Sequence, residues 1–158
     1  FVGNKKRKIF FVGAGINELV ALMSATRFKH MAMSVLPLED WKFRREEDVL
    51  IVISSSGENA LSLLYAEEAK KSNVTLIGVT SREKSRLARI SDHLILLEDL
   101  APYRIEYVEY QVAPEKLLKY VPAFEFTALI FLESLVAQIA DIKGILEEEM
   151  RSRHANIE

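Results

Sequence analysis

A cluster of small hydroxyl side chains follows one of the most apolar stretches of the chain. The segment VLIVISSSGEN, residues 49–59, runs from branched apolar residues into Ser54, Ser55, Ser56 and Gly57. Serine hydroxyls, together with the unpaired N–H groups at the start of a following helix, suit a dianionic phosphate. A serine that caps a helix without any ligand is an equally good interpretation of these residues. Local chemistry alone therefore leaves a phosphate site and an ordinary helix cap both open.

A second loop, GAGINE at residues 13–18, also follows a short apolar run. It carries only part of the G-x-G-x-x-G pattern of dinucleotide-binding loops, because Glu18 stands at the third glycine. No Gly-Lys-Ser/Thr follows either loop, so a Walker-type nucleotide site is not indicated. The histidines His30, His93 and His154 are scattered and lack metal-ligand spacing. We therefore expect neither a metal nor an organic cofactor.

The elements that would position these loops are visible as short apolar runs that alternate with amphipathic stretches. Strands are expected at 8–13, 31–37, 48–54, 74–80 and 92–98, and helices at 16–28, 59–73 and 81–91, with two more helices within 115–153. Strands that are apolar throughout are buried on both faces, and with helices between them they form a parallel sheet. The expected fold class is α/β, a flavodoxin-like three-layer α/β/α sandwich with a five-stranded parallel sheet of order 2-1-3-4-5.

In such a sheet, ligands bind beyond the carboxyl ends of the strands, at the point where the strand order reverses. With the order 2-1-3-4-5, this point lies between the first and third strands. The loops 13–18 and 54–59 would then face one another across the candidate site.

Length and composition set broad limits on function. The chain has 158 residues, no cysteine and a formal net charge of −2, which fits one domain over residues 1–158 and a cytoplasmic setting. The charge does not favour nucleic acid as a partner.

The most apolar segment, residues 124–142, was considered as a membrane span. It contains Glu125, Glu133 and Asp141, and a bilayer span would not normally hold three carboxylates. We interpret it as a core helix. Because it is apolar all round, part of it should be buried between subunits, which predicts a homo-oligomer.

The order of these motifs resembles a known family. The segment SSSGE after an apolar strand, followed by VTLIGVTSREKSRLARISDHLILL, resembles the SIS (sugar isomerase) domain of phosphosugar isomerases and phosphosugar-sensing regulators. FEFTALIFLESLVAQI at 124–139 and RHANIE at 153–158 are similar to the 6-phospho-3-hexuloisomerases within that family. The resemblance implies interconversion of 3-hexulose 6-phosphate and fructose 6-phosphate by proton transfer through an enediol, without a metal or cofactor.

The resemblance also implies roles for individual residues. Glu125 corresponds to the candidate base, and His154 to a second catalytic residue that reaches a neighbouring subunit's site. The residues expected to bind the substrate phosphate are Ser54, Ser56, Gly57, Thr80, Ser81, Asn17 and Ser85, with Glu58 and Asn59 as secondary residues.

The loop after the first strand departs from the family pattern. Where G-A-G-R-S-G is usual, this chain has Ile16, Asn17 and Glu18 after its glycines. Asn59 stands where a threonine is usual, and residues 99–121 have no clear counterpart. A carboxylate beside a dianion is repulsive by a few kcal/mol at low effective dielectric. The alternative function is therefore a non-catalytic SIS-type sensor that binds a phosphosugar without turnover.

Overall fold

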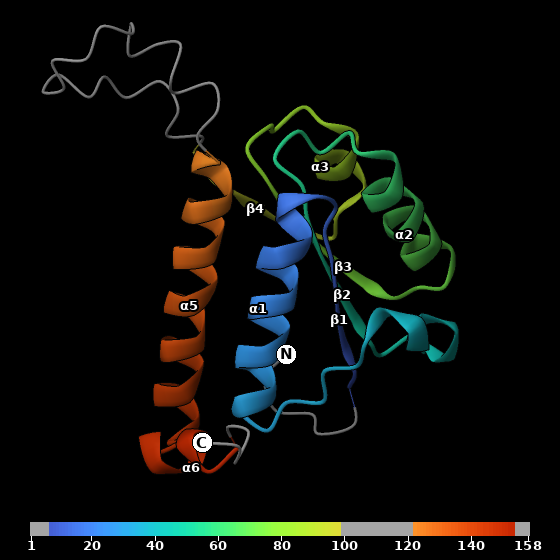
Figure 1. Cartoon of the computed structure of the whole chain (residues 1–158). Coiled ribbons are helices and arrows are strands. Elements are labelled where there is room, and N and C mark those ends of the chain that lie inside the picture. Colours follow the sequence, from blue (N-terminus) through green and yellow to red (C-terminus); the bar gives the residue numbers. More distant parts are fainter. Residues whose placement is uncertain (1–6, 99–121, 154–158) are drawn as a thin grey trace, which may run out of the picture.

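The computed structural model describes residues 7–98 and 122–153 as alternating strands and helices (Figure 1). In chain order the elements are β1 (Ile9–Val12), α1 (Ile16–His30), the 3-10 helix η1 (Leu38–Phe43), β2 (Val49–Ile53), α2 (Ala60–Lys71), β3 (Thr75–Thr80), α3 (Arg86–Ile90), β4 (His93–Leu96), α5 (Ala123–Lys143) and α6 (Glu147–Arg151). The predicted alternation of strands and helices is confirmed.

The sheet is parallel throughout, with the order β1-β2-β3-β4 in the described part of the chain. Val35 forms an isolated parallel bridge with Ile9 on the open side of β1. The bridge lies where the second predicted strand belongs, so the order 2-1-3-4-5 holds. The prediction of a full strand over 31–37 was wrong, because Pro37 cannot donate to a ladder and the chain enters η1 at Leu38. Within residues 7–98 and 122–153, the sheet therefore has four strands and one bridge where five strands were predicted.

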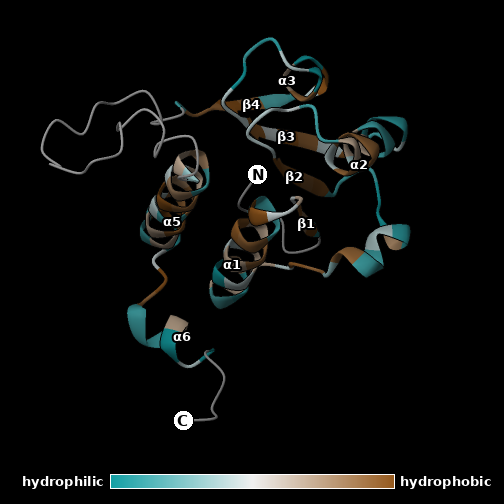
Figure 2. Cartoon of the chain, turned by 45° about the horizontal axis from the view of Figure 1, so that its top comes forward, coloured by the Kyte–Doolittle hydropathy of each residue, from teal (hydrophilic) through white to brown (hydrophobic). Residues whose placement is uncertain are grey.

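Two hydrophobic cores lie on the two faces of the sheet. The first joins β-strand side chains such as Phe11 and Ile51 to α1 and α5. The second joins Phe10 and Leu50, which point the other way, to η1, α2 and α3. The strands β1, β2 and β3 are therefore enclosed between helical layers (Figure 2), whereas β4 is largely exposed at the edge of the sheet. The three-layer α/β/α sandwich is confirmed.

The long helix α5 packs beside α1, and both helices begin at the same end of the molecule (Figure 1). The Arg27 side chain on α1 donates to Glu133 on α5 across 2.8 Å. By length and composition α5 could cross a membrane, but one side of it contributes buried Phe124, Ala128 and Leu132 to the first core. The interpretation of α5 as a core helix is confirmed for that side.

The helix predicted over 81–91 is shorter than expected. Ser85 is the N-cap of α3, and its hydroxyl accepts a hydrogen bond from the Ala88 N–H at 3.2 Å. Residues 81–85 therefore form a loop, which leaves Ser81 and Ser85 at the carboxyl end of β3. The segment 99–121 and the tail histidine His154 lie outside the described residues, and the single-domain boundary over 1–158 stays a prediction.

Candidate functional site

Three loops meet the carboxyl edge of the sheet, one after each of the first three strands. They are the β1–α1 loop (residues 13–15), the β2–α2 loop (residues 54–59) and the β3–α3 loop (residues 81–85). Because β1 pairs with β2 and β2 with β3, the β2–α2 loop lies in the middle. Parallel strands bring such loops together at one edge, where α/β proteins bind ligands.

The β2–α2 loop folds on its own serine hydroxyls. The Ser54 Oγ accepts a hydrogen bond from the Gly57 N–H at 3.2 Å, and the Ser56 Oγ accepts one from the Glu58 N–H at 3.2 Å. Within the described residues, neither hydroxyl donates its own proton. Ser54 is buried, whereas Ser56 is half-buried. Of these two hydroxyls, Ser56 is therefore the more accessible to a phosphate oxygen.

Gly57 allows the β2–α2 loop to lie directly against the β3–α3 loop. Its φ of +62° lies in the left-handed region. A Cβ at this position would lie 2.2 Å from the Ser85 Oγ and 3.1 Å from the Thr80 Oγ1. Only glycine meets both the conformation and the space.

Hydrogen bonds to one carbonyl join the two loops. Within the described residues, the Ser55 carbonyl accepts from the Thr80 hydroxyl at 2.9 Å, from the Ser81 hydroxyl at 3.0 Å and from the Ser81 N–H at 3.1 Å. The hydroxyl protons of Thr80 and Ser81 therefore hold the β2–α2 loop in place. Their predicted direct contact with phosphate stays a prediction.

The start of α2 already has a side-chain acceptor for its N–H groups. The Asn59 side chain caps α2 by accepting from the N–H groups of Leu61 and Ser62 at 3.0 and 3.1 Å. The structure therefore shows a helix cap, and it is Asn59 and not a serine that forms it. The expectation that these N–H groups would be unpaired was wrong, because the Asn59 side chain accepts their hydrogen bonds. The backbone N–H groups of Ser55, Ser56 and Asn59 have no acceptor among the described residues and remain available in the loop.

The β1–α1 loop is much less strongly bonded. Gly15 stands at the N-cap of α1 with a φ of +62°, and no side chain caps the helix. Ile16 and Glu18 are exposed in the first turn. The Asn17 side chain is half-buried, and its Oδ1 has no hydrogen-bond partner among the described residues. The substituted residues therefore do stand at the carboxyl edge of β1, as predicted.

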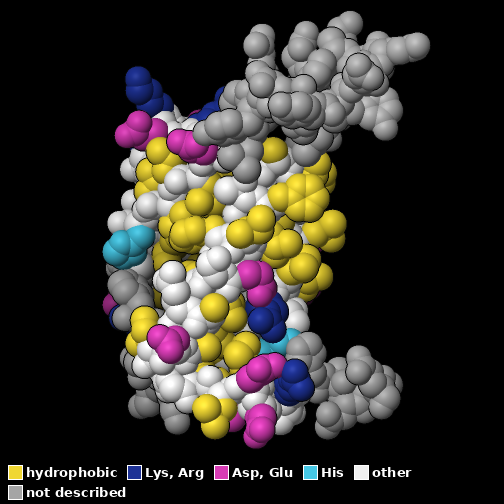
Figure 3. Space-filling view, turned by 90° about the vertical axis from the view of Figure 1, so that its left-hand side faces the viewer, with side chains coloured by type: hydrophobic (Ala, Val, Ile, Leu, Met, Phe, Trp, Pro, Cys, Tyr) yellow, Lys and Arg dark blue, Asp and Glu magenta, His cyan; other side chains and the backbone are white. Residues whose placement is uncertain are grey.

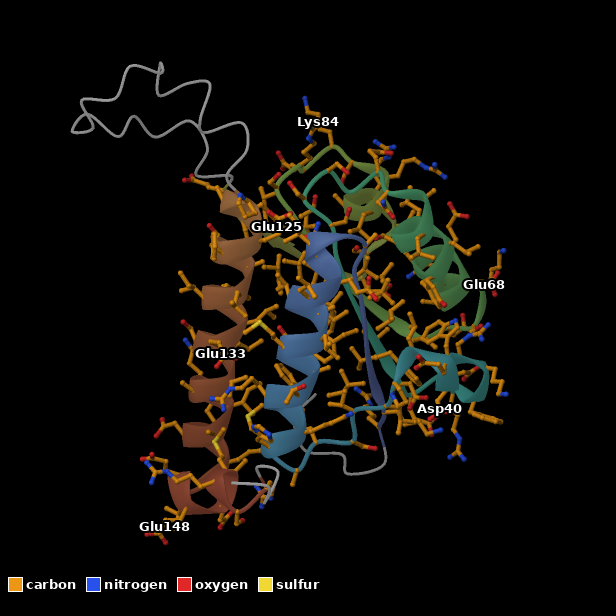
Figure 4. All side chains as sticks on the ribbon, viewed as in Figure 1. Asp40, Glu68, Lys84, Glu125, Glu133 and Glu148 are labelled. Atoms are coloured by element: carbon orange, nitrogen blue, oxygen red, sulfur yellow. The ribbon has the colours of Figure 1, made fainter. Side chains whose placement is uncertain are left out.

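Glu125 lies in the first turn of α5 and is half-buried. Figure 4 shows it at the same end of the molecule as Lys84 of the β3–α3 loop, while Glu148 marks the opposite end. Its carboxylate forms no hydrogen bond within residues 7–98 and 122–153. The same ranges contain no cluster of His, Asp and Glu that could hold a metal ion.

Ser55 was not among the predicted site residues, yet its backbone is the point at which the two loops join. No side-chain pattern could have indicated it, because the bonds are made by its carbonyl oxygen. Thr80 and Ser81, in contrast, were indicated by the resemblance to the SIS family.

Comparisons with known proteins agree with this arrangement. The model of the SIS domain matches residues 4–103. An uncharacterized protein of Archaeoglobus fulgidus is 32% identical over 154 residues, which cover 96% of this chain and 81% of the relative. The 3-hexulose-6-phosphate isomerase of Methanocaldococcus jannaschii is 29% identical over 155 residues, covering 97% and 78%.

A solved structure shows the same similarity in the fold. The crystal structure of a Methanococcus jannaschii protein, for which a function of 3-hexulose-6-phosphate isomerase is inferred, has a TM-score of 0.76 and 27% identity. The match covers 98% of this chain and 80% of that one. With the serine loop at the carboxyl edge of a four-stranded parallel sheet, these matches place the chain in the SIS domain family.

Proposed function

We propose that the protein is a phosphosugar isomerase that interconverts 3-hexulose 6-phosphate and fructose 6-phosphate. The observation that carries the proposal is the pair of interlocked hydroxyl loops at one edge of the sheet, with the Glu125 carboxylate at the same end of the molecule. The similarity to proteins named 3-hexulose-6-phosphate isomerase supports this choice among the SIS reactions.

The proposed phosphate contacts come from the β2–α2 loop. The hydroxyls of Ser54 and Ser56 and the N–H groups of Ser55 and Ser56 supply donors that no described residue uses. Hydrogen bonds to an ionised acceptor are shorter and stronger than neutral ones. Thr80, Ser81 and Ser85 support this loop from the neighbouring one, while Gly57 lets the two approach.

In the proposed reaction, Glu125 acts as the base. Its carboxylate takes a proton from C3 of fructose 6-phosphate, and the electron pair forms the C2–C3 double bond of an enediol. The C2=O electron pair moves onto O2, which takes up the proton that the O3 hydroxyl loses. Glu125 then returns its proton to C2, which yields the 3-ketose with a hydroxyl at C2. A carboxylate suits this work because it can accept and return one proton within the same site. His154 remains a proposed second catalytic residue.

The proposal is tested by following 3-hexulose 6-phosphate formation from fructose 6-phosphate, coupled to an aldolase that consumes the product. The wild-type protein should turn over. Glu125→Gln should lower kcat by about 10² to 10⁴ while leaving thermal unfolding unchanged. A folded wild-type protein without turnover above background would contradict the proposal.

A non-catalytic phosphosugar sensor is the second candidate, and the β1–α1 loop favours it. Ile16 offers no donor to a sugar phosphate, and exposed Glu18 adds a negative charge at the edge where the anion would bind. Calorimetry with fructose 6-phosphate separates the two candidates, because a sensor binds without forming product.

We further propose that the protein assembles with copies of itself through the outer sides of α1 and α5. Hydrophobic side chains gather on that side of the molecule (Figure 3), and the exposed large apolar residues of the two helices include Leu19, Leu22, Met23, Phe126 and Ile130. Monomeric proteins rarely expose such a continuous apolar patch. The Arg27–Glu133 ion pair joins α1 and α5, the two helices that carry the apolar patch.

Light scattering after gel filtration tests the assembly. Met23→Glu combined with Ile130→Glu should shift the protein to a smaller mass, whereas Leu64→Glu, on exposed α2, should not. A wild-type monomer at micromolar concentration would contradict the proposed surface. Cytoplasmic location stays a prediction.

A further inference from the structure

Glu58 places a carboxylate in a loop that is proposed to bind an anion. Its side chain is exposed, and it directly follows the glycine that contacts the β3–α3 loop. A fixed negative charge there opposes a dianionic ligand, because like charges repel, although solvent at the exposed side chain screens part of the repulsion. A carboxylate in this place therefore needs a function that offsets its repulsion.

The structure gives the carboxylate a specific partner. The Glu58 Oε1 accepts a hydrogen bond from the Arg86 backbone N–H at 2.7 Å, across 28 residues of sequence. Bonds between a carboxylate and a backbone N–H are charge-assisted and geometrically demanding. The Arg86 guanidinium is not part of this contact, because it pairs with Glu67 of α2 at 2.8 Å.

Glu58 completes the set of acceptors for the start of α3. The Leu87 N–H donates to the Gly57 carbonyl at 3.1 Å, and the Ala88 N–H donates to the Ser85 hydroxyl at 3.2 Å. The first three N–H groups of α3 are thus held by Glu58, Gly57 and Ser85. Two of these three acceptors come from the β2–α2 loop, so the helix start and that loop cannot move independently.

We propose that Glu58 is a positioning residue that fixes the β2–α2 loop against the start of α3 and so preorganises the phosphate donors of the loop. The inference rests on the proposed function and deepens it by assigning a role to a residue that carries no donor for the ligand. Its action is indirect, through the Arg86 amide. An amide side chain can replace it, because glutamine also offers an Oε1 acceptor.

Two variants of Glu58 and one control test the role. Glu58→Ala removes the acceptor, Glu58→Gln keeps the acceptor and removes the charge, and Glu67→Ala removes the other carboxylate that contacts Arg86. Hydrogen exchange of the Arg86 amide in the unliganded protein should accelerate about tenfold in Glu58→Ala and remain nearly unchanged in Glu58→Gln and Glu67→Ala.

Ligand binding and turnover supply the functional arm. The Kd and KM for fructose 6-phosphate should rise about tenfold in Glu58→Ala with kcat largely retained. Glu58→Gln should bind at least as tightly as the wild type, because it restores the acceptor without the repulsive charge. A kcat that falls equally in Glu58→Gln and Glu58→Ala would overturn the proposal by placing Glu58 in the chemistry.

The two proposals can fail separately. Unchanged Arg86 exchange and unchanged affinity in Glu58→Ala would overturn the positioning role while leaving the isomerase proposal intact. A wild-type protein that binds no fructose 6-phosphate would contradict the proposed function and with it the purpose of the contact, whereas the exchange experiment would still decide whether Glu58 holds α3 in place.

Discussion

The β2–α2 loop and the β1–α1 loop follow adjacent strands at the same edge of the sheet, yet they differ in how many internal hydrogen bonds hold them. The β2–α2 loop is tied at Ser54, Ser55, Gly57 and Glu58 and ends in the Asn59 cap. The β1–α1 loop has no side-chain cap, and its first helical turn exposes Ile16 and Glu18. One loop is fixed by internal hydrogen bonds, while the other is open to substitution.

This difference suggests a division of roles between the two loops, one for anion binding and one for the choice of substrate. A preorganised donor set binds a phosphate without first ordering the chain, so its geometry must be kept. A loop that contributes few internal bonds can change residues without unfolding the protein. We infer that the phosphate end of the ligand is held by the first loop and that the second influences which sugar is accepted.

The largest expected difference between the loops concerns their glycines, both at a φ of +62°. Gly57→Ala should lower the free energy of unfolding by roughly 3 kcal/mol, because its Cβ would meet Ser85. Gly15→Ala should cost only about 1 kcal/mol, because open space surrounds it and backbone strain alone remains. Urea unfolding of both variants measures the difference, and equal losses would contradict the comparison.

The next effect concerns ligand affinity. Ser56→Ala should weaken fructose 6-phosphate binding about tenfold, because it removes a half-buried donor to the phosphate. Ser134→Ala is the control, since that hydroxyl is exposed on α5 and bonds only to the Ile130 carbonyl. Calorimetry at constant ionic strength measures both; an unaltered Kd in Ser56→Ala would remove this residue from the site.

The helix caps provide a smaller effect on stability. Asn59→Ala should lower the free energy of unfolding by about 1 kcal/mol, because two N–H groups at the start of α2 lose their acceptor. Asn59→Asp should retain the cap. Asn17→Ala in the uncapped first turn of α1 should change stability by less than about 0.5 kcal/mol. Thermal unfolding distinguishes them, and a larger loss at Asn17 would reverse the comparison.

The smallest expected effect concerns the negative charge that Glu18 places beside the β1–α1 loop. Glu18→Gln should tighten fructose 6-phosphate binding about threefold at low salt, and the gain should shrink as salt screens the charge. Glu148→Gln, at the opposite end of the molecule (Figure 4), should have no effect. If Glu18→Gln weakens binding, Glu18 contacts the sugar favourably and the repulsive interpretation is wrong.

Much of the fold could be predicted from the sequence because its strands are apolar on both faces. The apolar runs that form β2 and β3 are typical of strands at the centre of a parallel sheet. The segment around Val35 misled the prediction, because its apolar residues pack beside β1 without extending into a strand. Short apolar runs do not distinguish a strand from a single bridge followed by a 3-10 helix.

The site was predictable in its side chains but not in its internal bonding. The serines at 54–56 stood out because they follow an apolar strand, whereas Thr80 and Ser81 were indicated by the family resemblance. The roles of the Ser55 carbonyl and of the Arg86 N–H could not be foreseen, since every residue carries the same backbone groups. Tertiary approach of the loops decides which of these groups meet.

The most direct test of the central claim is a crystal structure of the protein soaked with fructose 6-phosphate. We expect the phosphate group to lie at the β2–α2 loop, with its oxygens about 2.6 to 3.0 Å from the Ser56 Oγ and near the Ser55 and Ser56 N–H groups. The sugar chain should extend towards the first turns of α1 and α5, where Glu18 and Glu125 stand. A phosphate bound elsewhere, with the β2–α2 loop unoccupied at saturating ligand, would contradict the account.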